Sequence, residues 1–204
     1  DQDQGTQAIR EQFRAQWDRK REGSEEAKAA WYDEKFLLIQ GDFFGIQDFI
    51  FASGGETQQR AAKLLRGRSF YVALLSELAA LRVLEALDLP PVSQVVNAAG
   101  KFLIVAPNTP ETIAALARVQ AEFDAWFLHH TYGQSGIGLA RLPARARDFQ
   151  AGQPDEESPF RRLTKRLFEQ LEIVKLQRFR LCGDPPPAPL FEAFLDAFHN
   201  ERGE

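Results

Sequence analysis

The chain has 204 residues, of which 44% are hydrophobic and 26% are charged, and its formal net charge at pH 7 is −4. This composition is typical of a globular domain with a buried core, and the negative balance excludes a general polyanion-binding protein, so nucleic acid would have to meet a local basic patch. The single cysteine, Cys182, excludes an internal disulfide and fits a reducing cytoplasm, while the lack of a long apolar run predicts no membrane contact.

Residues 1–35 are highly charged and are predicted to form a helical connecting arm. Ile9, Phe13 and Trp17 recur at helical spacing, so one face of this segment is apolar. We expect the arm to dock on the core through Trp17 and Trp31.

Residues 36–148 predict a single domain with the order strand, helix, strand, strand, helix, strand. Short apolar runs indicate strands at 36–39, 92–97, 101–106 and 137–140. Longer stretches with helical periodicity lie between them, at 57–87 and 109–133. This order is the βαββαβ plan of the ferredoxin-like fold, an α+β class in which two helices cover one face of a four-stranded antiparallel sheet.

Residues 149–204 differ in character and predict a C-terminal helical extension. A helix is expected at 160–181, followed by a stiff proline-rich linker at 184–189. A short aromatic-rich segment at 190–198 ends the extension. The full prediction is therefore a ferredoxin-like domain with additional helices at both ends.

The first strand leads into Gly41-Asp42-Phe43-Phe44-Gly45, where an acid and two aromatics lie between glycines. Palm and nucleotide-cyclase domains of this plan place metal-binding carboxylates at the end of the first strand and in the hairpin between the second and third. Asp42 has the first of these positions, but the hairpin from Asn97 to Lys101 contains no acid, so a two-metal centre cannot be assembled there. We therefore predict no catalytic and no metal-binding residue, and Asp42 is either a pocket residue or a turn residue.

A second candidate is the basic segment in the first half of the long helix. Four positive charges without an acid among them lie within nine residues, at Arg60, Lys63, Arg66 and Arg68. The first three share a helical face that can hold the phosphates of a nucleotide or a nucleic acid, and a solvated face is the alternative. Gly67 interrupts the helical pattern, which predicts a close approach or a helix start there, and Ser69 is expected to cap or to touch a ligand.

Other signals are weaker. The third strand carries one aromatic, Phe102, and not the alternating set with which RNA-recognition domains stack bases. The residues His129, His130, His199 and Cys182 have no metal-ligand spacing and are interpreted as structural.

Four segments, in order, resemble motifs of one family. Residues 41–51 resemble G-D-I-S-G-I-Q-x-F-I-F, and residues 66–71 resemble R-x-R-S-F-Y. Residues 97–103 resemble a degenerate hairpin, and Lys175-Leu176-Gln177-Arg178-Phe179 is similar to K-L-x-x-F. Together they resemble the first palm domain of the large subunit of type III CRISPR effector complexes, most of all the III-A (Csm) type.

This resemblance implies a function within antiviral defence. The family's large subunit has an HD nuclease domain, two palms and a zinc ribbon. It makes cyclic oligoadenylates from ATP, with Mg²⁺ or Mn²⁺, at the paired palms. The second palm carries Gly-Gly-Asp-Asp and does the metal chemistry, whereas the first completes the nucleotide pocket. The implied partners are the second palm of the parent chain, other effector subunits, CRISPR RNA and target RNA.

We therefore predict a first palm from a longer, cytoplasmic protein that completes an ATP pocket and is inactive alone. The expected nucleotide contacts are Asp42, Gly45, Ser69, Asn97 and Gly100. Phe43 and Phe44 replace the Ile and Ser of the family motif, so contacts at this turn are expected from backbone N–H groups or from Gly45. The alternative is a scaffold module that binds no nucleotide, in which the basic helix contacts RNA or a neighbouring subunit.

Overall fold

A computed structural model describes residues 31–51, 58–98, 100–131, 133–150, 157–177 and 179. Most of the predicted connecting arm, the proline-rich linker and the last aromatic segment lie outside these residues. The strands are β1 (Phe36–Phe44), β2 (Gln94–Ala98), β3 (Lys101–Pro107) and β4 (Gly136–Ala144). The helices are α3 (Ile46–Phe51), α4 (Gln58–Ala86), α5 (Pro110–Thr131) and α6 (Pro159–Leu176), with short 3-10 turns η1 (Pro91–Ser93) and η2 (Ala146–Phe149).

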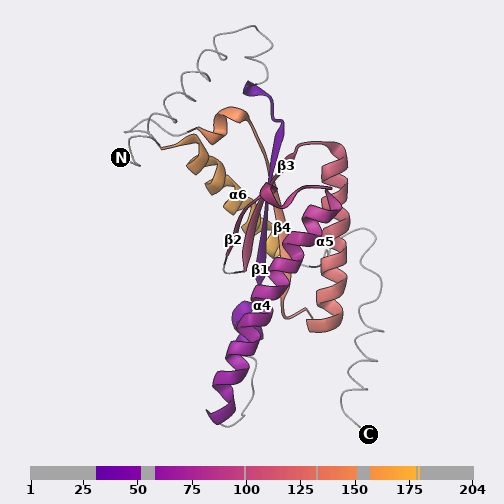
Figure 1. The fold of residues 1–204 in the computed structure, drawn as a ribbon, viewed down its shortest axis with the longest axis vertical. Coiled ribbons are helices and arrows are strands. Elements are labelled where there is room, and N and C mark those ends of the chain that lie inside the picture. The colour runs from indigo at the N-terminus through magenta and orange to yellow at the C-terminus, as the bar shows by residue number, and fades with distance from the viewer. Residues whose placement is uncertain are drawn as a thin grey trace.

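The four strands form one antiparallel sheet in the order β2-β3-β1-β4 (Figure 1). This confirms the predicted α+β class and the predicted four-stranded antiparallel sheet. Helix α3 was not predicted, and β2 begins at Gln94 instead of residue 92. The largest boundary differences lie in three other elements. Strand β1 continues through the Gly-Asp pair to Phe44, β4 extends to Ala144, and α6 ends at Leu176 instead of residue 181.

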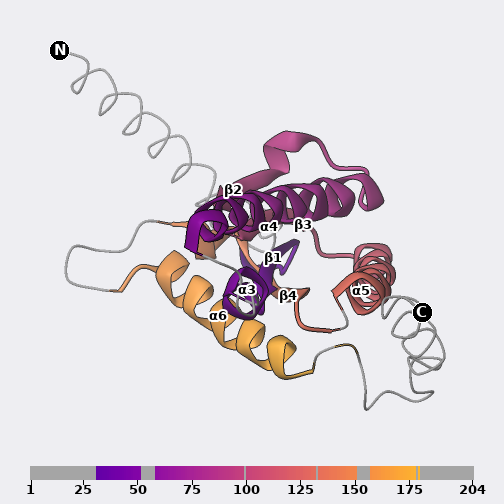
Figure 2. The ribbon, with the colours of Figure 1, turned by 90° about the horizontal axis from the view of Figure 1, so that it is seen from below.

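Both faces of the sheet are covered, because side chains of a strand alternate between its two faces. Leu37 and Ile39 of β1 pack in a core with the buried faces of α4 and α5. Leu38, between them, packs in a second core with Leu163, Leu167 and Leu171 of α6. Figure 2 shows α4 and α6 on opposite sides of the sheet. A strand buried on both faces has a continuous apolar sequence, which explains the run at 36–39.

Glycines inside the strands make room for large side chains. A Cβ on Gly41 would lie 2.1 Å from the ring of Phe102, its register partner on β3. A Cβ on Gly136 would lie 2.4 Å from the ring of Phe44. These glycines are therefore required by packing against neighbouring strands.

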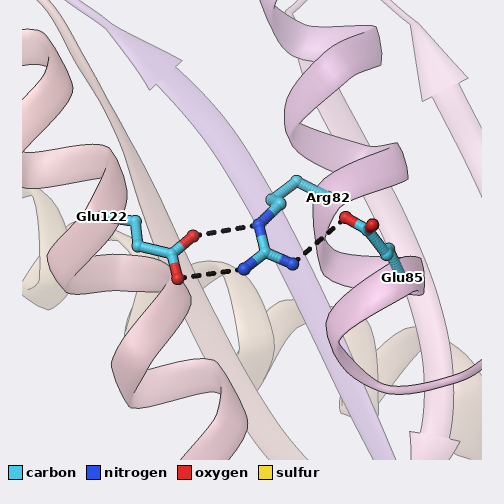
Figure 3. A network of polar contacts seen from close by, with 3 residues as sticks. All are labelled: Arg82, Glu85 and Glu122. Carbon is cyan, nitrogen blue, oxygen red and sulfur yellow. Dashed lines mark hydrogen bonds and ion pairs between the residues drawn. The ribbon is translucent and has the colours of Figure 1, made fainter.

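An ion-pair network joins α4 to α5 on the surface (Figure 3). Arg82 donates two hydrogen bonds of 2.9 Å to the carboxylate of Glu122 and one of 3.2 Å to Glu85. The hydrogen bonds to Glu122 raise the pKa of Arg82, so the guanidinium stays charged. Because both side chains are partly exposed, the pair holds the two helices in register more than it stabilises the fold.

The packing of α6 on the sheet can be tested with two leucines of that helix. Leu167 is 1% exposed and Leu176 is 87% exposed. We expect Leu167→Ala to lower the free energy of unfolding by about 2–5 kcal/mol, because it leaves a cavity against the sheet. The matched Leu176→Ala should change it by less than about 0.5 kcal/mol in urea unfolding. Equal effects would mean that α6 does not pack as described.

Candidate functional site

The turn between β1 and α3 lies beside the β2–β3 hairpin. Gly45 forms this turn with a φ of +74°, and a Cβ there would lie 2.1 Å from the carbonyl oxygen of Gln134. The next residue, Ile46, approaches Gly100 of the hairpin, whose Cβ position would be 3.2 Å from the Ile46 Cδ1. The N–H of Phe43 donates to the Gly100 carbonyl at 2.9 Å. The structure therefore brings Gly45 and Gly100 to the same end of the sheet.

The hairpin is also held against α4. The Asn97 side chain is exposed and donates a hydrogen bond to the Glu77 carboxylate on α4. On the same helix, the Ser76 Oγ lies 3.8 Å from the Cβ position of Gly100. The β1–α3 turn, the hairpin and the middle of α4 thus form one edge, and backbone groups of Gly45 and Gly100 belong to it.

Asp42 lies on the other face of β1 and is buried against α6. Its carboxylate oxygen Oδ2 is 2.7 Å from the Lys175 Nζ of α6 and 3.8 Å from the Lys101 Nζ of β3. The Asp42 side chain is 4% exposed, and that of Lys175 is 22% exposed. Two cations from two other elements therefore neutralise this acid.

The ammonium of Lys175 is stabilised in its charged form. Burial by itself lowers the pKa of Lys175, but hydrogen bonds to Asp42 and to Glu172, 2.9 Å away, outweigh burial and raise the pKa above its ordinary value of 10.5. An opposite charge within a few ångströms has this effect because it favours the ionised form. The carboxylate of Asp42 is therefore committed to an internal ion pair.

The residues at this end of the sheet do not fit a magnesium or manganese ion. The hairpin supplies no second carboxylate, and an ammonium lies where a cation would have to approach Asp42. Among the described residues, no group of three or more His, Cys, Asp or Glu side chains could hold a metal.

The aromatic residues of the turn belong to the core and do not face a ligand. Phe43 packs edge-on against Phe127 of α5, and Phe44 packs edge-on against Phe179 beyond α6. Phe179 has a φ of +55°, which a bulky residue adopts only when its surroundings impose it. Lys175 and Phe179 thus attach one short segment to two residues of the turn motif, Asp42 and Phe44.

The predicted contacts on α4 are separated from this edge. Ser69 is exposed and lies seven residues before Ser76, about 10 Å along the helix axis. Arg68 is used internally, since it donates to the Ile50 carbonyl of α3 at 3.1 Å. Lys63 and Arg66 are exposed, and the side chain of Arg60 lies outside the described residues.

The prediction for Gly67 is wrong. Gly67 lies inside α4, so no helix starts there. Among the described residues, no atom outside the neighbouring backbone of α4 lies within 4 Å of its Cβ position, so no close approach requires a glycine. Sequence reasoning also missed Lys175 as the partner of Asp42. The two residues are far apart in the chain, and the only signal was that both belong to motifs of the same family.

Comparison with known proteins decides the family. Residues 35–185 match the family model described as Csm1 subunit domain B. The chain belongs to this family. Csm1 domain B is a part of the Cas10/Csm1 effector subunit of type III-A CRISPR systems.

A curated relative and two solved structures agree with this assignment. The chain is 35% identical over 147 residues, 72% of its length, to the single-strand-specific deoxyribonuclease Cas10/Csm1 (subtype III-A) of Thermococcus onnurineus, and spans 18% of that protein. It is 33% identical to the Csm1 chain of a Csm1–Csm4 cassette in complex with AMPPNP, covering 74% of this chain and 20% of that one, with a TM-score of 0.65. For the cassette in complex with one ATP the identity and both coverages are the same, and the TM-score is 0.63.

In the part of this chain that the structure describes, no helix is both long and apolar enough to cross a membrane.

The ion pair at Asp42 gives a stability prediction. Lys175→Met leaves a buried carboxylate with the more distant Lys101, so we expect a loss of about 3 kcal/mol in the free energy of unfolding, at the lower end of the cost of breaking a buried ion pair. The control Lys165→Met removes an exposed lysine of the same helix and should cost less than about 0.5 kcal/mol. Adding Asp42→Asn to Lys175→Met should restore much of the loss; a double variant weaker than the single one would contradict the pairing.

The same pair sets a pH dependence. Because the folded pKa of Lys175 is raised, its contribution is fully present below about pH 10.5 and is lost as the pH rises through the folded value. The difference in stability between the wild type and Lys175→Met should therefore be constant near neutral pH and shrink in the alkaline range. Urea unfolding of both proteins from pH 7 to 11 measures it.

Two glycines of the same sequence region are expected to respond in opposite ways to alanine. Gly45→Ala places a Cβ against the Gln134 carbonyl at positive φ and should destabilise the fold by more than about 1 kcal/mol. Gly67→Ala fills open space in a helix and should stabilise it by roughly 0.5–1 kcal/mol. Thermal unfolding of the two variants checks both signs, and a neutral Gly45→Ala would disprove the tight turn.

Proposed function

We propose that this chain is the first, acid-free palm of its parent Csm1 subunit and that it completes an ATP pocket whose metal chemistry is done by a second palm. The pocket edge on this chain is the β1–α3 turn with the β2–β3 hairpin. The product of the paired palms is a cyclic oligoadenylate. The chain by itself makes none.

The observation that carries this proposal is the internal pairing of Asp42. The one acid at the end of β1 is bound to Lys175 at 2.7 Å, and the hairpin has no acid to join it. A domain with this arrangement lacks the carboxylates for metal-assisted phosphoryl transfer. Its related structures nevertheless include complexes with AMPPNP and with ATP, which supports a role in binding nucleotide.

Backbone groups are the means by which this edge would contact ATP. Gly45 and Gly100 both have positive φ values and lie at the same end of the sheet, where Gly45 is partly exposed and Gly100 is buried. Turns of this kind present N–H groups that bind phosphate oxygens. Asn97 lies beside them and is exposed. Because Ser69 lies farther along α4, it could contact only the part of the nucleotide that extends away from the turn. Asp42 lies on the other face of β1, where it pairs with Lys175, and its side chain is too buried to contact a nucleotide at this edge.

An exposed apolar face on α4 supports docking of another domain. Its side chains recur at helical spacing and are 41–69% exposed, at Phe70, Leu74, Leu78 and Leu81. The edge strand β2, which α4 contacts, adds the exposed Val95 and Val96. Exposed apolar side chains gathered on one helix face in this way usually mark an interface. We assign it to the second palm of the parent chain, within a complex that also holds CRISPR RNA, target RNA and subunits such as the Csm4 of the related cassettes.

A second candidate function is a scaffold that binds no nucleotide. It is favoured by the exposed Lys63 and Arg66, which lie on one face of α4 away from the turn. In that case α4 would contact RNA or a neighbouring subunit, and the β1–α3 turn would be structural.

Calorimetry with ATP separates the two functions in the parent protein with both palms. If Ser69 touches the nucleotide, Ser69→Ala should weaken ATP binding about tenfold, the value of a hydrogen bond to a charged group. Ser93→Ala, in η1 before β2, is the matched control and should leave affinity unchanged. The purified chain of 204 residues should yield no oligoadenylate with ATP and Mg²⁺ or Mn²⁺ in a chromatographic assay.

Unchanged affinity in Ser69→Ala would make Ser69 a helix residue without ligand contact and would leave the β1–α3 turn and the hairpin as the pocket edge. Equal ATP affinity of the second palm with and without this chain would favour the scaffold. Oligoadenylate synthesis by the chain alone would refute the assignment of a non-catalytic palm.

A further inference from the structure

The first half of α6 carries a concentrated positive charge on its outer side. Residues 158–168 contain four cations and no acid. All four are exposed, at Arg161, Arg162, Lys165 and Arg166. The buried leucines of α6 face the sheet, and Figure 2 shows the helix at the outside of the fold, opposite α4. The cations are therefore presented away from the core.

This charge is unfavourable for the helix that carries it. The N-terminal end of a helix has a partial positive charge, which favours acids in the first turn, and α6 has no acid there. Arg161 and Lys165 are four residues apart, as are Arg162 and Arg166, and like charges at this spacing repel each other. The sequence thus places cations where both effects destabilise α6.

Contacts within the domain offset little of the electrostatic repulsion among these four cations. The Arg161 Nε is 3.9 Å from the Glu157 carboxylate, and the Arg161 side chain is 80% exposed. Arg162 donates to the Glu157 carbonyl at 2.9 Å. In the part of the chain that the structure describes, Lys165 and Arg166 have no hydrogen bond or ion pair. An anion from outside the domain would therefore relieve the repulsion.

The pattern of charges and aromatics favours a nucleic-acid strand over an acidic protein segment. Cations four residues apart are about 6 Å apart along the axis, so the helix offers a regular row to a chain of phosphates. Three of the four are arginines, whose planar fork binds phosphate by two hydrogen bonds. Phe160 and Phe168 flank the row and are 37% and 46% exposed, although Phe160 contacts the ring of Phe149 and the Lys101 Nζ lies 5.4 Å over the ring of Phe168. Their exposed parts could contact unpaired bases beside the phosphates.

We propose that the outer face of the first half of α6 binds the sugar-phosphate backbone of a single-stranded nucleic acid. This surface lies on the opposite side of the sheet from the basic residues of α4. It does not depend on nucleotide binding at the β1–α3 turn, so either proposal can fail without the other.

The test uses the full 204-residue chain and a fluorescent 20-nucleotide oligouridine, with binding measured by anisotropy at several salt concentrations. Lys165→Gln/Arg166→Gln should weaken binding several-fold and lower the slope of log affinity against log salt by about 1.4, or about 0.7 for each lost phosphate contact. The matched control Arg118→Gln/Arg141→Gln removes two exposed arginines elsewhere and should leave the affinity within about twofold.

Thermal unfolding separates binding from a structural role. Because Lys165 and Arg166 repel their neighbours, Lys165→Gln/Arg166→Gln should fold normally and be at least as stable as the wild type. A less stable double variant would give these cations a structural role and would overturn the proposal.

Competition identifies the ligand class. Unlabelled single-stranded RNA or DNA should displace the probe, and the relative potency of the two shows whether the 2′-hydroxyl contributes. Polyglutamate of equal charge should displace it poorly. Displacement by polyglutamate alone, an unaltered affinity in Lys165→Gln/Arg166→Gln, or an equal loss in the control variant would each refute binding of a nucleic-acid strand by α6.

Discussion

The position of α6 across the end of β1 is tied to the ion pair between Asp42 and Lys175. A buried carboxylate such as that of Asp42 is very costly unless a cation and hydrogen bonds compensate its charge. Lys175 comes from the last turn of α6, so compensation requires this helix to lie across the end of β1. Phe179, a few residues later, packs on Phe44 and attaches the same segment a second time.

Because Lys175 and Phe179 hold α6 on the sheet, both faces of the sheet are covered by helices. A ferredoxin-like sheet with helices on one side leaves its other face open, and here α6 closes that face. The acid that would hold a metal in a catalytic palm is then enclosed with a lysine. At this end of the sheet Asn97 is exposed, Gly45 is partly exposed and Gly100 is buried, so the proposed nucleotide contacts rest on Asn97 and the backbone of Gly45. The other accessible surfaces are the apolar face of α4 and the basic face of α6, which suit different partners.

Much of the fold follows from local patterns. The continuous apolar run at 36–39 indicated a central strand, and the acid-free hairpin at 97–101 argued against metal chemistry before any contact was known. Gly67 shows the limit of such reasoning, because a glycine in a helical pattern has the same sequence appearance whether or not an atom packs against it. Phe43 and Phe44 show it as well: their rings enter the core, where the sequence had suggested an apolar turn around a ligand.

The sequence by itself determined the order and type of the four strands and the three long helices in the described part of the chain, and the absence of a second acid in the hairpin, since periodicity and composition are local properties. It did not predict the short helix α3. Only the tertiary structure decided which side of the sheet α6 covers and that Lys175 meets Asp42. These two residues are separated by most of the chain, and no periodicity connects them. A buried carboxylate is stable only with a cation close to it, and the packing of α6 on the sheet brings Lys175 to that position from the far end of the domain.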